Sequence, residues 1–316
     1  MNLTRRDWLA AAPALAGAAL AAAPATAPAQ SPDRPAGHPF LYGLNTSTLQ
    51  GHKLTIVEEI EIAAKAGYQG LEPWVRELDQ HVKSGGSLKD LGQRTRDRGL
   101  SVESAIGFFD WAVDDDARRE KGLEEARRSM ELVARIGGKR VAAPPVGVTD
   151  RSDIDPRRLA ERYRKLCELG KSIGVVPELE LWGFSKTLGR LPEVVQVAVA
   201  AAHPDACVLL DVYHMYKGGS DVQGMALLNG AALPVIHFND YPAAPPRETI
   251  TDAHRVYPGD GIAPIAQVVR ILRDIRFQGM LSLELFNRDY WKQDALEVAR
   301  TGLEKMRAAV RRGLSE

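Results

Sequence analysis

The sequence contains little cysteine and no excess of charge of either sign. Cys167 and Cys207 are the only cysteines among the 316 residues, and their spacing fits neither a metal-binding pair nor a redox motif. Lysine plus arginine and aspartate plus glutamate each number 41, so the formal net charge is zero and a basic footprint for nucleic acid is missing. We therefore expect two free, buried thiols and no nucleic-acid partner.

Long hydrophobic runs are also scarce, and the one near the N-terminus is rich in alanine. It extends to about residue 23, which is too short for a comfortable membrane span. The stretch Thr4-Arg5-Arg6-Asp7-Trp8-Leu9 precedes it and a Pro/Ala segment follows it, a pattern typical of a twin-arginine export signal. An ordinary secretory signal or a lipid-facing anchor is the alternative. We predict a signal peptide over residues 1–29, a flexible leader over 30–39, a periplasmic location and no membrane anchor after cleavage.

The rest of the chain alternates short apolar runs with helical patterns. A glycine-rich dinucleotide fingerprint is missing after the first run, which disfavours the rival doubly wound open sheet. Eight strand–helix units in about 270 residues match the size of a closed (β/α)₈ barrel. We therefore predict an α/β fold with one TIM barrel over residues 40–312 and helices between the strands, including a short helix over 222–229. The expected strands cover 40–44, 68–72, 100–106, 140–143, 175–181, 206–211, 234–238 and 279–285.

Four successive strands in the second half end in residues that can bind a metal. These residues are Glu180, Asp211, His237 and Glu284, and each has the inward parity of its strand. A buried acid or histidine needs a partner, and the carboxyl ends of barrel strands form the active site. Glu178 shares the parity of Glu180. We assign Glu180 as the ligand because it lies nearer the mouth, and Glu178 as a second-layer ion pair, with the reverse assignment as the alternative.

Three carboxylates and one imidazole form a site that is rich in oxygen. Such a site suits one divalent metal, with Mn²⁺, Mg²⁺ or Co²⁺ favoured over Zn²⁺, and leaves room for two substrate oxygens. A metal that chelates a hydroxyl and a neighbouring carbonyl acidifies the carbon-bound proton, and a nearby carboxylate can move that proton to the next carbon. This chemistry predicts a sugar isomerase or epimerase that works through a metal-stabilised enediolate.

The residues from Leu41 to about Val310 resemble the xylose-isomerase-like sugar isomerase/epimerase barrels, and within them the inosose (2-keto-myo-inositol) isomerase subgroup. The resemblance implies that Glu180, Asp211, His237 and Glu284 hold the metal and that the two glutamates form the proton-transfer pair. It also implies that His214 and Arg255 contact substrate oxygens. The motifs that carry it are Leu179-Glu-Leu-Trp-Gly183, Leu210-Asp-Val-Tyr-His214, Ile236-His-Phe-Asn-Asp240, Asp252-Ala-His-Arg-Val-Tyr-Pro-Gly-Asp-Gly261 and Ser282-Leu-Glu-Leu-Phe286.

Several residues near the expected mouth are weaker candidates for substrate binding. Glu72 ends the second strand with inward parity and is either a ligand for a substrate hydroxyl or part of a structural salt bridge. For His214 the alternative is a polar loop residue, and for Arg255 a surface arginine. Aromatic side chains in the loops suit the C–H face of a sugar ring, although some of them pack the mouth; they are Trp74, Phe109, Trp111, Trp182 and Tyr257.

Three other functions compete with the isomerase or epimerase. A dehydratase acting on a keto-polyol or keto-glycoside starts with the same proton removal. A non-catalytic periplasmic sugar-binding barrel would not need two proton-transfer carboxylates. An abasic-site endonuclease of the same fold needs further histidines after the second and third strands, where the sequence has Glu72-Pro-Trp-Val and Ile106-Gly-Phe-Phe-Asp. We expect a small carbohydrate or cyclic polyol ketone as the partner, and a homo-oligomer is compatible with the sequence.

Overall fold

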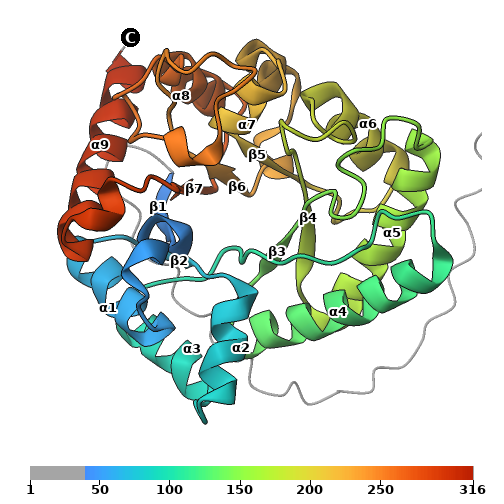
Figure 1. Ribbon diagram of the computed structural model, residues 1–316, viewed down its shortest axis with the longest axis horizontal. Coiled ribbons are helices and arrows are strands. Elements are labelled where there is room, and N and C mark those ends of the chain that lie inside the picture. The colour runs from blue at the N-terminus through green and yellow to red at the C-terminus, as the bar shows by residue number, and fades with distance from the viewer. Residues whose placement is uncertain (1–39, 316) are drawn as a thin grey trace, which may run out of the picture. The chain divides into compact units, whose positions relative to one another are not determined.

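The computed structural model describes residues 40–315, which form a parallel sheet curled inside a ring of helices (Figure 1). The strand order in the sheet is β2-β1-β7-β6-β5-β4-β3, and every neighbouring pair is parallel. This arrangement confirms the predicted α/β fold of the TIM-barrel type. The strands are β1 (Leu41–Asn45), β2 (Gly70–Glu72), β3 (Arg140–Ala143), β4 (Val176–Glu180), β5 (Val208–Asp211), β6 (Val235–His237) and β7 (Met280–Leu283).

The prediction of a regular strand over residues 100–106 is wrong. This stretch forms only isolated bridges, from Ser101 to Gly70 and from Ile106 to Trp74. Its hydrogen bonds alternate between two sides: the Ser101 carbonyl accepts from the amide of Leu71, and the Ala105 carbonyl accepts from the amide of Ala142. The two bridges are isolated and lie several residues apart, so they do not form a continuous ladder. The stretch nevertheless links β2 to β3, so the curled sheet is joined all the way round.

Helices cover the outside of the sheet, and local sequence explains where several of them begin and end. Thr55 and Glu58 form a capping box at the start of α1, and Gly67 ends this helix with a φ of 94°. Helices α2 and α7 were not predicted, and the segment 222–229 is largely 3₁₀ helix. The α-helices are α1 (Ile56–Ala66), α2 (Val75–Lys83), α3 (Leu88–Asp97), α4 (Asp116–Arg135), α5 (Pro156–Ile173), α6 (Leu191–Ala201), α7 (Val212–Lys217), α8 (Ile265–Asp274) and α9 (Ala295–Ser315), and the 3₁₀ helices are η1 (Thr46–His52), η2 (Val222–Leu227), η3 (Gly230–Ala232), η4 (Asp252–His254) and η5 (Tyr290–Lys292).

The inside of the barrel has an apolar floor, to which Leu209, Val235 and Met280 contribute. Met280 fills its share of the interior so closely that a Cβ at Gly43 would lie 2.3 Å from its sulfur, and one at Gly70 would lie 2.5 Å from it. Side chains alternate along a strand, so the residues two positions further on also point inward. That parity places polar side chains directly above the floor, at the carboxyl ends of the strands.

The structure bears on two further sequence predictions. Cys167 and Cys207 are free and buried, as predicted. No helix within residues 40–315 is both long and apolar enough to cross a membrane. The predicted signal peptide and leader, residues 1–39, lie outside the described residues, so export and a periplasmic location stay predictions.

Candidate metal centre and substrate cavity

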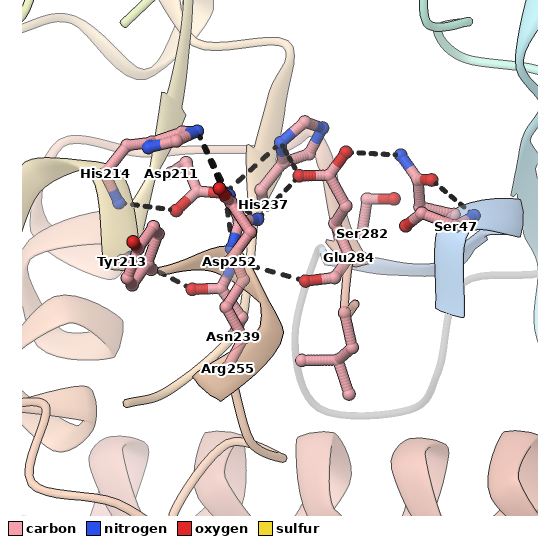
Figure 2. Close-up of polar contacts among 12 residues, drawn as sticks. Ser47, Asp211, Tyr213, His214, His237, Asn239, Asp252, Arg255, Ser282 and Glu284 are labelled. Atoms are coloured by element: carbon pink, nitrogen blue, oxygen red, sulfur yellow. Dashed lines mark hydrogen bonds and ion pairs between the residues drawn. The ribbon is translucent and has the colours of Figure 1, made fainter. Parts of the chain in front are cut away.

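Three of the four predicted metal ligands converge above the floor of the barrel. Asp211 ends β5, His237 ends β6 and Glu284 directly follows β7, and these three strands are neighbours in the sheet. One ligand atom from each side chain lies within 4.8 Å of the other two. The Nδ1 atom of His237 is 3.1 Å from Oε2 of Glu284 and 3.5 Å from Oδ2 of Asp211 (Figure 2). All three residues are buried.

The atoms of this cluster fit a divalent cation. Nδ1 of His237 is buried and has no hydrogen-bond partner among the described residues. Two carboxylate oxygens and one imidazole nitrogen are a donor set that Mn²⁺, Co²⁺ and Zn²⁺ accept. Within residues 40–315, this is the group of histidine, cysteine and acidic side chains whose geometry can hold a metal. Burial alone would lower the pKa of His237, but the charges of Glu284 and Glu72 hold it well above its usual value.

Glu72 lies behind His237 and holds its other ring nitrogen. Nε2 of His237 is 3.2 Å from Oε2 of Glu72, and the same carboxylate accepts hydrogen bonds from Ser282 Oγ at 2.6 Å and Asn45 Nδ2 at 2.9 Å. Burial would raise the pKa of Glu72, but His237 and these hydrogen bonds lower it. Glu72 is fully buried and is not among the residues that line the cavity above the metal cluster. Its position therefore suits a carboxylate that orients a metal-binding histidine better than a contact with substrate.

Arg255 is buried against the carboxylates, so the alternative of a surface arginine is excluded. Its Nη1 donates to Oδ2 of Asp211 at 2.8 Å and to Oε2 of Glu284 at 2.7 Å (Figure 2). Its Nη2 donates to Nε2 of His214 at 3.0 Å and to the carboxylate of Asp252. Burial would raise the pKa of Asp211, but the guanidinium of Arg255 and the neighbouring His214 and His237 together lower it well below its usual value. Arg255 thus balances the negative charge of the cluster.

His214 lies on α7, directly after the metal-binding strand β5. Oδ1 of Asp211 caps this short helix by accepting the amide of His214 at 2.8 Å. Burial and the neighbouring charge of Arg255 lower the pKa of His214, so its ring is neutral. Because Arg255 can only donate, Nε2 of His214 accepts and the ring proton lies on Nδ1. Nδ1 is buried and has no hydrogen-bond partner in the described chain, and other atoms of the residue line the cavity.

The two glutamates of β4 have different surroundings. Glu180 lines the cavity, whereas Glu178 does not and instead accepts a hydrogen bond from Ser104. Burial raises the pKa of Glu178 to about 7. The predicted ion pair of Glu178 is not formed within residues 40–315, where its Oε1 has no hydrogen-bond partner. Burial, together with the carboxylates of Glu284 and Asp211, raises the pKa of Glu180 well above its usual value. Glu180 is outside the three-residue cluster, so its role as a fourth ligand stays a prediction.

A cavity of about 640 Å³ opens above these groups. Its deep end is polar, and aromatic rings surround its mouth. Of the aromatic residues singled out in the sequence, Trp74 and Trp182 line this cavity, whereas Phe109, Trp111 and Tyr257 are buried in packing contacts. The lining residues are Gln50, Trp74, Ile106, Phe108, Glu180, Trp182, Phe184, His214, Thr251, Asp252, Ala253, Arg255, Glu284, Phe286, Arg288 and Trp291.

Sequence reasoning missed two asparagines that support the cluster. Asn239 donates from Nδ2 to Oδ2 of Asp211 at 2.9 Å, and its Oδ1 accepts the amide of Tyr213. Asn45 donates to Glu72 and, at 3.3 Å, to Oε1 of Glu284. Asn45 ends β1, so the rule that polar residues at strand ends face the site would have found it. Asn239 could have been found by the same rule, because it lies two residues beyond His237 and has the same inward parity.

The contact between Glu72 and His237 leads to a testable prediction about metal affinity. In Glu72→Gln an amide nitrogen, which cannot accept a hydrogen bond, replaces one carboxylate oxygen. This nitrogen faces either His237 or the donors Asn45 and Ser282, so one of these contacts is lost in either orientation. We expect the affinity for Zn²⁺ to fall by about 10–100-fold, as for other losses of a histidine-orienting carboxylate. Competition with a chromogenic chelator measures this affinity. Glu103→Gln is the control, because Glu103 is a buried carboxylate that pairs with Lys139 outside the cavity. Equal affinities in wild type and Glu72→Gln would contradict the assignment.

Comparisons with known proteins identify the family of this chain. Residues 60–309 match the family described as Xylose isomerase-like TIM barrel. The inosose isomerase of Bacillus velezensis is 27% identical over 277 residues, which cover 84% of this chain and 94% of that protein. The 3-dehydroshikimate dehydratase of Pseudomonas aeruginosa is 25% identical over 240 residues, which cover 74% of this chain and 36% of that protein.

The fold is also similar to the folds of solved structures. The structure of the IOLI protein with a bound zinc atom has a TM-score of 0.80 at 21% identity, and the match covers 88% of this chain and 100% of that chain. The resemblance drawn from the motifs is therefore confirmed, and the family match spans most of the barrel. The chain belongs to the xylose isomerase-like TIM barrel family.

Proposed function

We propose that the protein is a metal-dependent isomerase or epimerase that moves a proton between adjacent carbons of a keto sugar or keto-inositol. One observation carries the proposal: Glu284 of the cluster with Asp211 and His237 lines the same cavity as the additional carboxylate of Glu180. Binding a sugar does not require a buried carboxylate beside a metal centre, whereas proton transfer does. The relatives named inosose isomerase support the same reaction class.

The residues of the chain have distinct tasks in this reaction. A divalent metal bound by the cluster would polarise a substrate carbonyl and acidify the hydrogen on the neighbouring carbon. Glu180 lines the cavity and takes this hydrogen as a proton. Glu284 returns a proton that has exchanged with solvent to the neighbouring carbon, so the substrate regains the one proton that it lost. Glu284 is held in one orientation by Arg255 and by Asn45. Such fixed positions favour proton transfer because the reacting groups need no further ordering.

His214 and Arg255 orient the substrate. Both residues line the cavity, and the guanidinium of Arg255 lies between His214 and the metal cluster. The burial of Arg255 gives it a second task, because it is hydrogen-bonded to Asp211 and Glu284. Removing it would leave these carboxylates short of a partner, so its loss affects stability as well as substrate binding.

A dehydratase is the second candidate, and the similarity to the 3-dehydroshikimate dehydratase of Pseudomonas aeruginosa favours it. Removal of a proton next to a carbonyl begins both reactions. The dehydratase then expels a hydroxyl group as water, whereas the isomerase or epimerase returns the proton to carbon. The products therefore distinguish the two functions.

Proton exchange in D₂O tests the proposal directly. The metal-loaded protein is incubated with a panel of ketoses and inososes, with and without a phosphate group, and NMR follows both deuterium incorporation and the products. We expect deuterium at a carbon next to the carbonyl of at least one substrate, together with an isomer or epimer of that substrate. Protein stripped with a chelator is the control and should show neither. Deuterium incorporation in no member of the panel would defeat the proposal, and an unsaturated product would favour the dehydratase.

A further inference from the structure

Five aromatic side chains follow one another around the mouth of the cavity. The ring centroids of successive members are between 5.1 and 6.1 Å apart. These separations lie within the range in which aromatic rings attract one another. The members come from four segments, which follow β2, the linking stretch 101–106, β4 and β7. The row therefore crosses a large part of the mouth. We call it the aromatic collar, and it consists of Phe184, Trp182, Phe108, Trp74 and Phe286.

Both ends of the aromatic collar meet the polar end of the cavity. The ring of Phe184 is 5.7 Å from the ring of His214, which accepts a hydrogen bond from Arg255. At the other end, the guanidinium carbon of Arg255 lies 5.2 Å from the ring centroid of Phe286. The collar therefore begins and ends beside His214 and Arg255, the residues to which the proposed function gives the task of orienting the substrate.

Two members of the collar expose much of their apolar surface. Phe108 is 41% exposed and Phe184 is 48% exposed, while the other phenylalanines in residues 40–315 are buried or half-buried. Burying such a ring in the core would stabilise the fold by the hydrophobic effect, so leaving two of them at one cavity mouth has a cost. Exposed apolar surface that adjoins a polar cavity is typical of a binding site.

The chemistry of the mouth selects among the possible occupants. The polar residues that line the cavity besides Glu180, His214, Arg255 and Glu284 are Gln50, Thr251, Asp252 and Arg288. A second sugar can stack its C–H face on one ring, but its hydroxyl groups would lie beside the other rings of the collar, where they lose hydrogen bonds to water without replacement. A flat apolar ring loses none and stacks favourably. The cavity volume of about 640 Å³ is in the range that holds drug-sized ligands, which are larger than a monosaccharide.

We propose that the aromatic collar binds an aromatic aglycone, so that the substrate is an aryl glycoside whose keto-sugar ring lies at the metal centre. The proposal rests on the proposed function for the sugar end of the ligand. The aglycone end depends only on the collar, and it can be tested by binding without turnover.

Calorimetry with pairs of non-reactive glycosides tests the collar. The full chain loaded with Zn²⁺ is titrated with phenyl and methyl β-glycosides in the gluco, galacto and xylo configurations. The members of a pair share their sugar ring and differ only in the aglycone. We expect the phenyl compound of at least one pair to bind about tenfold or more tightly than its methyl partner, from ring burial and stacking.

Truncation of the collar should remove this preference. In Phe184→Ala and in Phe108→Ala the ratio of phenyl to methyl affinity should fall by about threefold or more, because each change removes one stacking face. Both side chains are about half exposed, so the changes leave the core intact. Leu227→Ala is the control, because Leu227 is 91% exposed and does not line the cavity; its ratio should equal that of wild type.

Several results would overturn the proposal. Equal affinity of phenyl and methyl compounds, or no binding of any glycoside, would exclude an aromatic aglycone. Tighter binding of methyl β-cellobioside than of phenyl β-glucoside would show that the collar holds a second sugar. A phenyl preference together with no deuterium exchange on any ketose, inosose or phenyl keto-glycoside would support the collar and defeat the isomerase. Deuterium exchange without a phenyl preference would support the isomerase and defeat the proposed role of the collar.

Discussion

Replacing Asp211 by asparagine should abolish the retention of a divalent metal while leaving the barrel folded. Oδ2 of Asp211 lies in the three-residue cluster and also accepts hydrogen bonds from Arg255 and Asn239. An amide nitrogen in its place would face two donors and could not bind a cation. If the amide turns round, the nitrogen faces the amide of His214 instead. Either orientation leaves donors unpaired, so we also expect the free energy of unfolding to fall by about 1–3 kcal/mol.

Metal analysis after dialysis, with thermal unfolding of the same samples, measures both effects. The apolar floor, including Leu209 two residues before Asp211, is unchanged in the variant, which is why the fold should survive. Asp260→Asn is a matched control, because Asp260 pairs with Lys305 outside the cavity and its loss should leave the metal content unchanged. Stoichiometric metal in Asp211→Asn, at wild-type affinity, would show that the cluster is not the metal site.

Changing Glu180 or Glu284 to glutamine should slow deuterium incorporation into substrate by about 10²–10⁴-fold, the effect of removing a general acid or base. The two variants should differ in their metal content. Glu284 belongs to the three-residue cluster, so its change should also weaken metal binding. Glu180 lies outside that cluster, so Glu180→Gln should keep more of its metal and lose mainly the proton transfer.

The exchange rate therefore has to be measured per metal-loaded site. Glu178→Gln is a stringent control, because Glu178 lies two residues earlier on the same strand and does not line the cavity. It should exchange deuterium close to the wild-type rate. If Glu178→Gln abolished exchange and Glu180→Gln did not, the assignment of the two glutamates would be reversed. Wild-type rates in both Glu180→Gln and Glu284→Gln, with metal bound, would refute the proposed mechanism.

The candidate metal centre could be predicted from the sequence because strand parity is a local property. Side chains alternate along a strand, so the inward residues of β5 and β6 follow from the positions of the apolar runs. The register then aligns Asp211 with His237, and His237 with Ser282, as neighbours. The same parity identifies Glu284 two residues after Ser282. Three of the four predicted ligands came together for this reason.

The roles of Glu72 and Arg255 could not be predicted in the same way. Strand parity correctly predicted that the side chain of Glu72 points into the barrel. Only the curvature of the sheet decides which residues it meets there. Its partner Ser282 is 210 residues away in the chain. Arg255 comes from a loop without periodicity, so its position depends on how the segment between β6 and β7 packs back over the cluster. Neither contact leaves a pattern in the nearby sequence.

The sequence by itself determined most of the strands and outer helices, the apolar floor and the metal-binding residues at the strand ends, because consecutive positions carry the periods of 2 and 3.6 residues. The tertiary structure alone decided that residues 101–106 link two strands without forming a regular one, that Asn45 reaches Glu284 across 239 residues, and that separate loops build the aromatic collar. These features arise where a curled sheet brings distant segments together, and their geometry is set by closure rather than by local propensity.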